Sequence, residues 1–156
     1  EIDKYGWVDL GSSFLPSEIV AAFLYAQLEH LNEIQSRRIG LWNQYQNNLE
    51  ILERNELIKL PFIPSFATNN AHIFYIIFPD EIKRNRCINF LRDNHFQSVF
   101  HYISLHKSPF YNKKHDGRDL SESDLYSCTL LRLPMFFELT IEDINKICGL
   151  IKEFCI

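Results

Sequence analysis

The chain has 156 residues, of which 46% are hydrophobic, 14% aromatic and 23% charged. This composition is typical of a folded globular protein, of about the length of one domain, and excludes a disordered or fibrous one. Its 16 Lys and Arg against 20 Asp and Glu give a formal net charge of −4. This small negative net charge does not indicate a basic surface for nucleic acid or an anionic membrane, so neither is expected as a partner.

Glycine is scarce, with 5 residues in the chain. Loops that hold nucleotide phosphates need clustered glycines, because the backbone must approach the phosphate closely. Neither GxGxxG nor GxxxxGK[ST] occurs, so the chain carries neither common nucleotide-binding loop. Its first residues, Glu1 to Tyr5, lack a start Met and the charged-then-apolar order of a signal peptide, which indicates a fragment.

The cysteines show no CxxC pair and no regular spacing; they are Cys87, Cys128, Cys148 and Cys155. On one helix, Cys148 and Cys155 would lie about 10 Å apart along the axis, too far for a disulfide. We expect free thiols in a reducing cytosol, with a metal site as a weaker alternative, and therefore a cytoplasmic protein without a metal. The longest apolar run, Ile73 to Phe78, is far too short to span a membrane.

A long helical pattern follows an irregular first segment. It begins near Ser17, a suitable N-cap, and its apolar spacing continues as far as Leu52. Because this run exceeds an ordinary globular helix, we expect either two helices that meet near Glu33 to Arg38 or one long bent helix. A helix of that length would bridge two domains or a subunit interface.

The remaining pattern alternates strands with helices. We expect strands at Leu57–Leu60, Ala71–Phe78 (central), Phe96–Tyr102 and Thr129–Leu133. We expect one helix after the cap Asp80, a short helix over Ser121–Ser127, and a last helix after Thr140. Thr140 with Asp143 is close to a capping box, and Leu105 to Asp119 should be a loop. The order predicts an α+β fold with a small sheet.

The most suggestive polar residues are His101, Tyr102 and His106, at a strand end that leads into a loop. Two imidazoles five residues apart could converge on one site and, with a phenol, bind phosphate, sugar hydroxyls or a carboxylate. From spacing alone, ordinary strand-end polar residues are the alternative. A zinc site is less favoured, since His95, His101 and His106 lack compact ligand spacing.

A second candidate is Ser12 and Ser13 with Gly11, just before the first helix. Short hydroxyls and free backbone N–H groups there suit an anion such as phosphate. The alternative is an ordinary helix cap. We expect a structural role for His72 and a solvated side chain for Lys107, and no GxSxG motif indicates a serine nucleophile.

Several sequence blocks resemble, in order, the C-terminal part of one enzyme family. The blocks are Tyr5 to Glu18 followed by Ala21-Ala22 and Ala26 to Glu29, Asn70 to Tyr75, Val99 to His106 with Pro109, and Leu131 to Phe136 before Leu139-Thr140. Together they are similar to the pyridoxal-phosphate-dependent nucleotide-sugar aminotransferases of the DegT/DnrJ/EryC/StrS family. Within the family, the resemblance is greatest to the dTDP-4-amino-4,6-dideoxygalactose transaminases.

The resemblance implies the small C-terminal domain of a fold-type-I aminotransferase, with a mostly antiparallel sheet packed with helices. Residues 1–16 would end the large domain and form an intersubunit loop, 17–55 would be the linking helix or helix pair, and 56–156 the small α+β domain. The large domain, with the Schiff-base lysine and most of the pyridoxal 5'-phosphate site, would precede this chain. No position here matches that lysine, so we expect no catalytic residue in this chain and no activity from it alone.

The family resemblance also implies roles for the two candidate sites. In a homodimer, Ser12 and Ser13 would reach the cofactor phosphate of the second subunit, although many members have Asn where Ser13 stands and Arg where Leu15 stands. His101, Tyr102 and His106 would face the nucleotide sugar. The intact enzyme would transfer an amino group from an amino acid, with glutamate as expected donor, to a dTDP-4-keto-6-deoxy sugar for surface polysaccharides such as lipopolysaccharide. The alternative is a stand-alone, non-enzymatic α+β domain for ligand binding or dimerisation.

Overall fold

Two consecutive helices open the fold, which is seen in a computed structural model that describes residues 8, 9, 11 and 15–156. Helix α1 spans Glu18–Glu29 and α2 spans Leu31–Arg54. Ser17 caps α1 as predicted, since its Oγ accepts a hydrogen bond from Val20 N at 3.4 Å. The helical run is interrupted at His30 (φ −103°, ψ 15°), three residues before the predicted junction.

The sheet has three antiparallel strands in the order β1-β3-β2. Strand β1 is Phe74–Ile77, β2 is Val99–Phe100 and β3 is Leu130–Leu133. The predicted central strand therefore lies at an edge, and β3 is central. Instead of a strand at Leu57–Leu60, there is a single bridge between Lys59 and Ile77, since the prolines that follow cannot extend a ladder of N–H donors.

Three further helices complete the α+β fold that the sequence predicted. Helix α3 spans Glu81–Asp93, α4 spans Ser121–Thr129 and α5 spans Ile141–Cys155. Both predicted caps are confirmed, because Asp80 accepts from Lys83 N at 2.7 Å and Thr140 forms a complete capping box with Asp143. A short 3-10 helix, η1 (Leu105–Lys107), interrupts the predicted loop.

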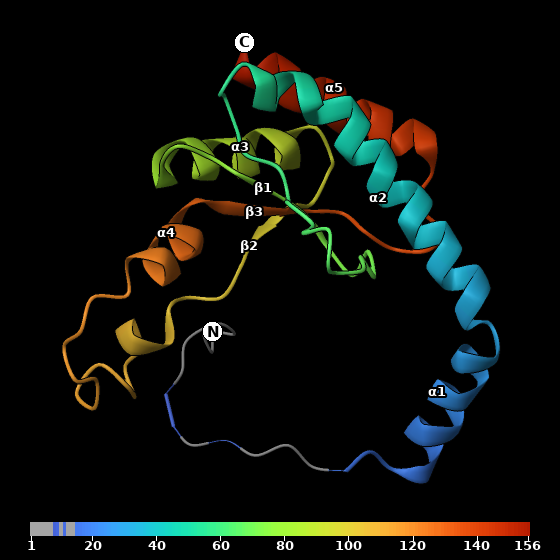
Figure 1. Cartoon of the computed structure of the whole chain (residues 1–156), viewed down its shortest axis with the longest axis horizontal. Helices are drawn as coiled ribbons and strands as arrows, with labels where there is room; N and C mark the ends of the chain where they lie inside the picture. Colours follow the sequence, from blue (N-terminus) through green and yellow to red (C-terminus); the bar gives the residue numbers. More distant parts are fainter. Residues whose placement is uncertain (1–7, 10, 12–14) are drawn as a thin grey trace.

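The core lies between the sheet and helices α2, α3 and α5, which gather on one side of it (Figure 1). Tyr45 of α2 stacks on Phe74 of β1 with ring centroids 5.0 Å apart, and its hydroxyl donates to the Pro134 carbonyl at 3.0 Å. Along β3, Leu131 and Leu133 are buried in this core, whereas Arg132 between them is half-buried. Because side chains alternate along a strand, Arg132 belongs to the opposite face of the sheet.

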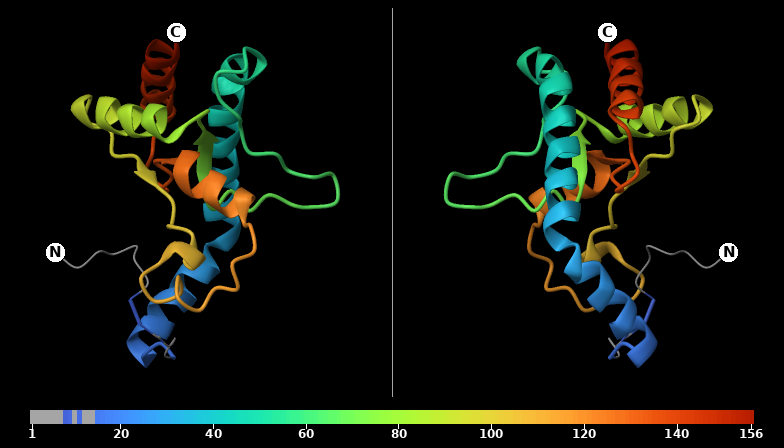
Figure 2. Two further views of the ribbon diagram at one scale, coloured as in Figure 1. Left: turned by 90° about the vertical axis from the view of Figure 1, so that its left-hand side faces the viewer. Right: turned by 90° about the vertical axis from the view of Figure 1, so that its right-hand side faces the viewer.

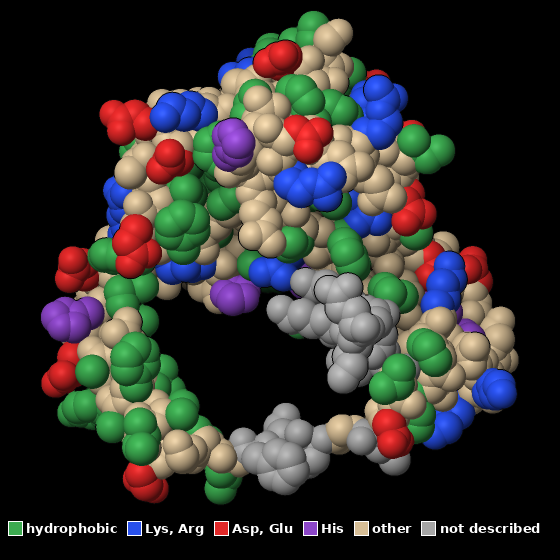
Figure 3. Space-filling view, turned by 180° about the vertical axis from the view of Figure 1, so that it is seen from behind, with side chains coloured by type: hydrophobic (Ala, Val, Ile, Leu, Met, Phe, Trp, Pro, Cys, Tyr) green, Lys and Arg blue, Asp and Glu red, His purple; other side chains and the backbone are tan. Residues whose placement is uncertain are grey.

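Helix α1 stands apart from the rest of the fold (Figures 1 and 2). None of its residues is buried. Its large apolar side chains are all more than half exposed: Ile19, Val20, Phe23, Leu24, Tyr25 and Leu28. Apolar side chains gather over this helix in Figure 3. So large an exposed apolar face on one helix indicates a surface that packs against another body.

Candidate functional site

His101 directly follows strand β2 and lies near Arg132 of β3. Its ring is half-buried and meets the Tyr102 ring nearly at a right angle, with centroids 5.1 Å apart. Burial, together with the positive charge of Arg132, lowers the pKa of His101, so its imidazole is neutral at neutral pH. Among the described residues, nothing accepts from or donates to its buried Nδ1. Such an orphaned nitrogen is available for a polar group brought by a ligand.

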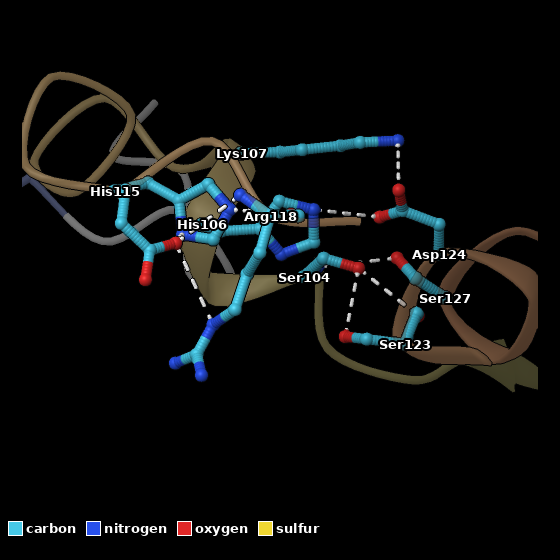
Figure 4. A network of polar contacts seen from close by, with 9 residues as sticks. Ser104, His106, Lys107, His115, Arg118, Ser123, Asp124 and Ser127 are labelled. Carbon is cyan, nitrogen blue, oxygen red and sulfur yellow. Dashed lines mark hydrogen bonds and ion pairs between the residues drawn. The ribbon is translucent and has the colours of Figure 1, made fainter. Parts of the chain in front are cut away.

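His106 lies on η1 and is held from two sides (Figure 4). Its Nε2 approaches Asp124 Oδ1 of α4 to 3.1 Å, and its ring packs against His115 with centroids 5.1 Å apart. Lys107 Nζ lies 2.8 Å from the other oxygen of Asp124. The hydrogen bond from Lys107 is the main reason that the pKa of Asp124 is lowered, and it raises the pKa of Lys107. Lys107 is exposed, as expected of a solvated side chain, and it also pairs with Asp124.

Serine side chains fix the segment between the two histidines to the same helix (Figure 4). Ser104 is buried, and its N–H donates to Ser127 Oγ at 3.3 Å. Its hydroxyl donates to the Ser123 carbonyl at 3.0 Å and accepts from Ser123 Oγ at 3.2 Å. The chain from His101 to Lys107 is thus a defined surface rather than a loose loop.

The two histidines do not converge as the spacing suggested. No contact in the described ranges joins His101 to His106, because His106 turns toward α4 and His115 while His101 lies beside Arg132. A pocket of about 330 Å³ opens next to His106, and its charged lining includes Lys114, Asp116 and Arg118. Asp124 was not among the predicted site residues. It lies on a predicted helix, next to Ser123 and three residues before Ser127.

A larger groove of about 570 Å³ lies between residues 95–99 and the chain that follows β3. Arg132 contributes its charge, and Val99, Phe96 and Met135 contribute apolar wall. Arg132 was part of a matching sequence block but was not nominated as a site residue. The alternation of Leu131, Arg132 and Leu133 was the signal that could have found it.

Ser12 and Ser13 lie outside the described residues, so their proposed phosphate contact stays a prediction. His72 is held through its backbone: its N–H donates to Asn70 Oδ1 at 3.1 Å, and its carbonyl accepts from Arg38 Nη2. This arrangement agrees with a structural role.

The described residues do not form a pyridoxal phosphate site by themselves. The lysine that binds such a cofactor is enclosed, whereas every described lysine is exposed or half-buried: Lys59, Lys83, Lys107, Lys113, Lys114, Lys146 and Lys152.

Over the same residues, no group of three His, Cys, Asp or Glu side chains could hold a metal ion. All four cysteines are free thiols, as predicted. None of the described helices is both long and apolar enough to cross a membrane.

Comparison with known proteins assigns the family. The model of the DegT/DnrJ/EryC1/StrS aminotransferase family matches residues 2–152. This chain belongs to that family. Solved aminotransferases share its fold. One is DesV from S. venezuelae in complex with a ketimine intermediate. It is 22% identical to this chain with a TM-score of 0.81, and the match covers 99% of this chain and 41% of DesV.

Two other family structures agree. A DegT DnrJ EryC1 StrS aminotransferase from Brucella abortus is 26% identical with a TM-score of 0.72, over 86% of this chain and 34% of that protein. The PLP form of the sugar aminotransferase Spr1654 from Streptococcus pneumoniae, which is described as putative, is 18% identical with a TM-score of 0.76, over 89% of this chain and 36% of that protein. The DegT/DnrJ/EryC1/StrS chain described here thus spans about a third to two fifths of the length of these structures.

Proposed function

We propose that this chain is the C-terminal portion of a sugar-nucleotide aminotransferase. The intact protein transfers an amino group from an amino acid, with glutamate as the donor, to the keto group of a dTDP-4-keto-6-deoxy sugar. The observation that carries this proposal is the family match over residues 2–152 together with a shared fold. Bound pyridoxal 5'-phosphate supplies the chemistry of the transfer, since it accepts the amino group from the donor and passes it to the sugar.

The exposed face of α1 supports a division of the chain into three parts. Residues 17–55 link two domains, with the apolar side chains of α1 packed on a large domain that binds the cofactor. Residues 56–156 form the small domain. Residues 1–16 carry Ser12 and Ser13 toward the cofactor phosphate of the second subunit in a cytoplasmic homodimer.

The substrate wall of the small domain consists of His101, Tyr102 and His106. His101 offers a neutral imidazole whose Nδ1 has no hydrogen-bond partner among the described residues, and Tyr102 is 49% exposed beside it. His106 packs against His115 and lies 3.1 Å from Asp124, so a polar contact with the nucleotide sugar would need little reordering. The sequence blocks support a sugar like that of the dTDP-4-amino-4,6-dideoxygalactose transaminases, and hence a role in lipopolysaccharide or another surface polysaccharide.

A substrate panel tests this proposal. The full-length protein, loaded with pyridoxal phosphate, is incubated with L-glutamate and each of several dTDP-keto sugars, and amino sugars are identified by mass spectrometry. We expect amination of a 4-keto-6-deoxy sugar in preference to 3-keto isomers. Amination of no nucleotide sugar by a correctly folded, cofactor-loaded protein would overturn the proposal.

A further inference from the structure

We propose that Cys128 is a site of oxidation, at which hydrogen peroxide converts the thiol to a sulfinate that pairs with Arg84. Cys128 lies in the last turn of α4, and Arg84 lies on α3, which contacts α4. This modification is independent of the proposed function. Its basis is a buried guanidinium with unused hydrogen-bond donors beside a free thiol.

Arg84 is a buried cation whose donors are only partly used. Its side chain is 5% exposed, and among the described residues neither Nε nor Nη1 has a hydrogen-bond partner. Its Nη2 reaches Glu81 at 3.4 Å, but that acid is itself 56% exposed. Burial is the main reason that the pKa of Arg84 is lowered. Because a buried charge with unused donors is costly, an anion at Nε or Nη1 would stabilise this region.

Three elements enclose the guanidinium of Arg84. It is carried by α3, its Cζ lies 5.2 Å from the centre of the Phe100 ring in β2, and α4 contacts both α3 and β2. On α4, Arg84 interacts electrostatically with Cys128. An anion formed at the sulfur of Cys128 would therefore lie near a cation that has donors to spare.

A second cation and partial exposure also favour reaction at Cys128. Lys107 of η1 interacts electrostatically with this thiol as well, while its Nζ pairs with Asp124, one turn earlier on α4 (Figure 4). Cys128 is free and half-buried, so a small oxidant can reach its sulfur. Reactive cysteines are typically found in such partly exposed positions beside cations.

The other three cysteines lack this combination. Cys87 and Cys148 are buried in the core, and burial raises the pKa of each thiol to about 12. Cys155 is half-buried like Cys128, but burial raises its pKa more than the single nearby cation, Lys83, lowers it. Cys155 is therefore the matched control for Cys128 within the same molecule.

The oxidant is hydrogen peroxide, and each step transfers two electrons from sulfur. The thiolate sulfur attacks one peroxide oxygen, an S–O bond forms as the O–O bond breaks, and the departing hydroxide takes up a proton to become water. The sulfur of the resulting sulfenate attacks a second peroxide in the same way, which gives a sulfinate and another water. The sulfinate is anionic, and its oxygens accept charge-assisted hydrogen bonds of the kind that Arg84 can donate.

Peroxide treatment of the full-length protein tests this inference. The sulfinate at each cysteine is measured over time by peptide mass spectrometry. We expect Cys128 to be oxidised at least fivefold faster than Cys155. Arg84→Gln should slow oxidation of Cys128 at least threefold, and Arg84→Lys should slow it less. The matched control is Arg86→Gln, which removes an exposed arginine from the same helix and should leave the rate unchanged.

Cys87 and Cys148 report on folding in the same experiment, because they should stay unoxidised while the core is intact. If Arg84→Gln exposes them, the comparison of Cys128 with Cys155 in the wild type decides alone. Equal oxidation of Cys128 and Cys155 in the wild type would overturn the proposal. So would an unchanged rate at Cys128 in a folded Arg84→Gln variant, or a disulfide at Cys128 in place of the sulfinate.

Discussion

Lys107 Nζ lies 2.8 Å from Asp124 Oδ2, and this ion pair joins the chain that leaves β2 to helix α4. Asp124 also faces His106, so one carboxylate contacts two of the three residues of η1. The consequence is that a segment which reads as a loop presents a fixed surface. Its order should therefore depend on the ionisation of Asp124.

Replacing the carboxylate should loosen this segment without unfolding the domain. We expect Asp124→Asn to raise amide hydrogen exchange across residues 104–107 at least severalfold, because the ion pair with Lys107 is lost. Exchange in α5 should stay unchanged. The matched control Asp116→Asn removes an acid 3.5 Å from Arg118, outside this contact. Equal exchange across residues 104–107 in wild type and Asp124→Asn would show that the ion pair does not order them.

The same contact predicts a pH dependence. The pKa of Asp124 is lowered below its ordinary value of 3.8 by Lys107, so the contact stabilises the fold above that value and is lost as pH falls through the folded-state pKa. The expected result is that the wild type loses protection of residues 104–107 below about pH 4, whereas Asp124→Asn shows no such step. Exchange measured by NMR between pH 6 and pH 3 checks this. A step of equal size in both proteins would assign it to another carboxylate.

Truncating Phe74 should lower the free energy of unfolding more than most other substitutions in the core. It is fully buried and contacts Trp42 and Tyr45, with ring centroids 5.3 Å and 5.0 Å away. Phe74→Ala should lower the free energy of unfolding by about 3–5 kcal/mol, because it removes buried apolar area and leaves a cavity. Phe66→Ala, at a side chain that is 91% exposed, should change it by no more than about 0.5 kcal/mol. Urea denaturation measures both, and similar losses for the two variants would contradict the packing described.

The N-cap of α5 contributes less to the free energy of unfolding than Phe74 does, and its contribution can be measured separately. The Thr140 hydroxyl accepts from Asp143 N at 3.1 Å, and Thr140→Ala should cost about 1 kcal/mol of unfolding free energy. Thr140→Ser keeps the hydroxyl and should recover most of the loss. If Thr140→Ser is as unstable as Thr140→Ala, the methyl group rather than the cap accounts for the effect.

The cysteines should differ in reactivity although all are free. Burial raises the pKa of both Cys87 and Cys148 to about 12, so almost no thiolate forms at pH 8 in the folded protein. Iodoacetamide should therefore modify the half-buried Cys128 well before these two, as read by peptide mass spectrometry. In denaturant all four should react alike. Modification of Cys87 as fast as Cys128 in the folded state would contradict the burial.

The helices could be predicted from the sequence because their signals are local. Asp80 and the Thr140–Asp143 pair act within one helical turn of the caps they form. Strand order is different, since it depends on pairing between distant segments. Phe74–Ile77 is apolar enough to read as a central strand, yet β3, more than fifty residues later, takes the centre by pairing with both β1 and β2.

The candidate site was predictable in its residues but not in its geometry. The spacing of His101 and His106 does not reveal which way the chain turns between them. The chain turns toward α4, where Asp124 contacts His106, and this helix lies beyond a long polar segment. Arg132 was visible as a charge between two leucines, but the side chains that surround it are set by the pairing of β3 with β1 and β2.

The donor half-reaction of the full-length protein tests the central claim most directly. L-glutamate is added to the protein loaded with pyridoxal phosphate, with no sugar present, and 2-oxoglutarate is measured together with the cofactor spectrum. We predict one 2-oxoglutarate per bound cofactor and conversion of the cofactor from its aldehyde to its amine form. A folded, cofactor-loaded protein that releases no 2-oxoglutarate and leaves the cofactor unchanged with glutamate or any other amino acid would contradict an aminotransferase function.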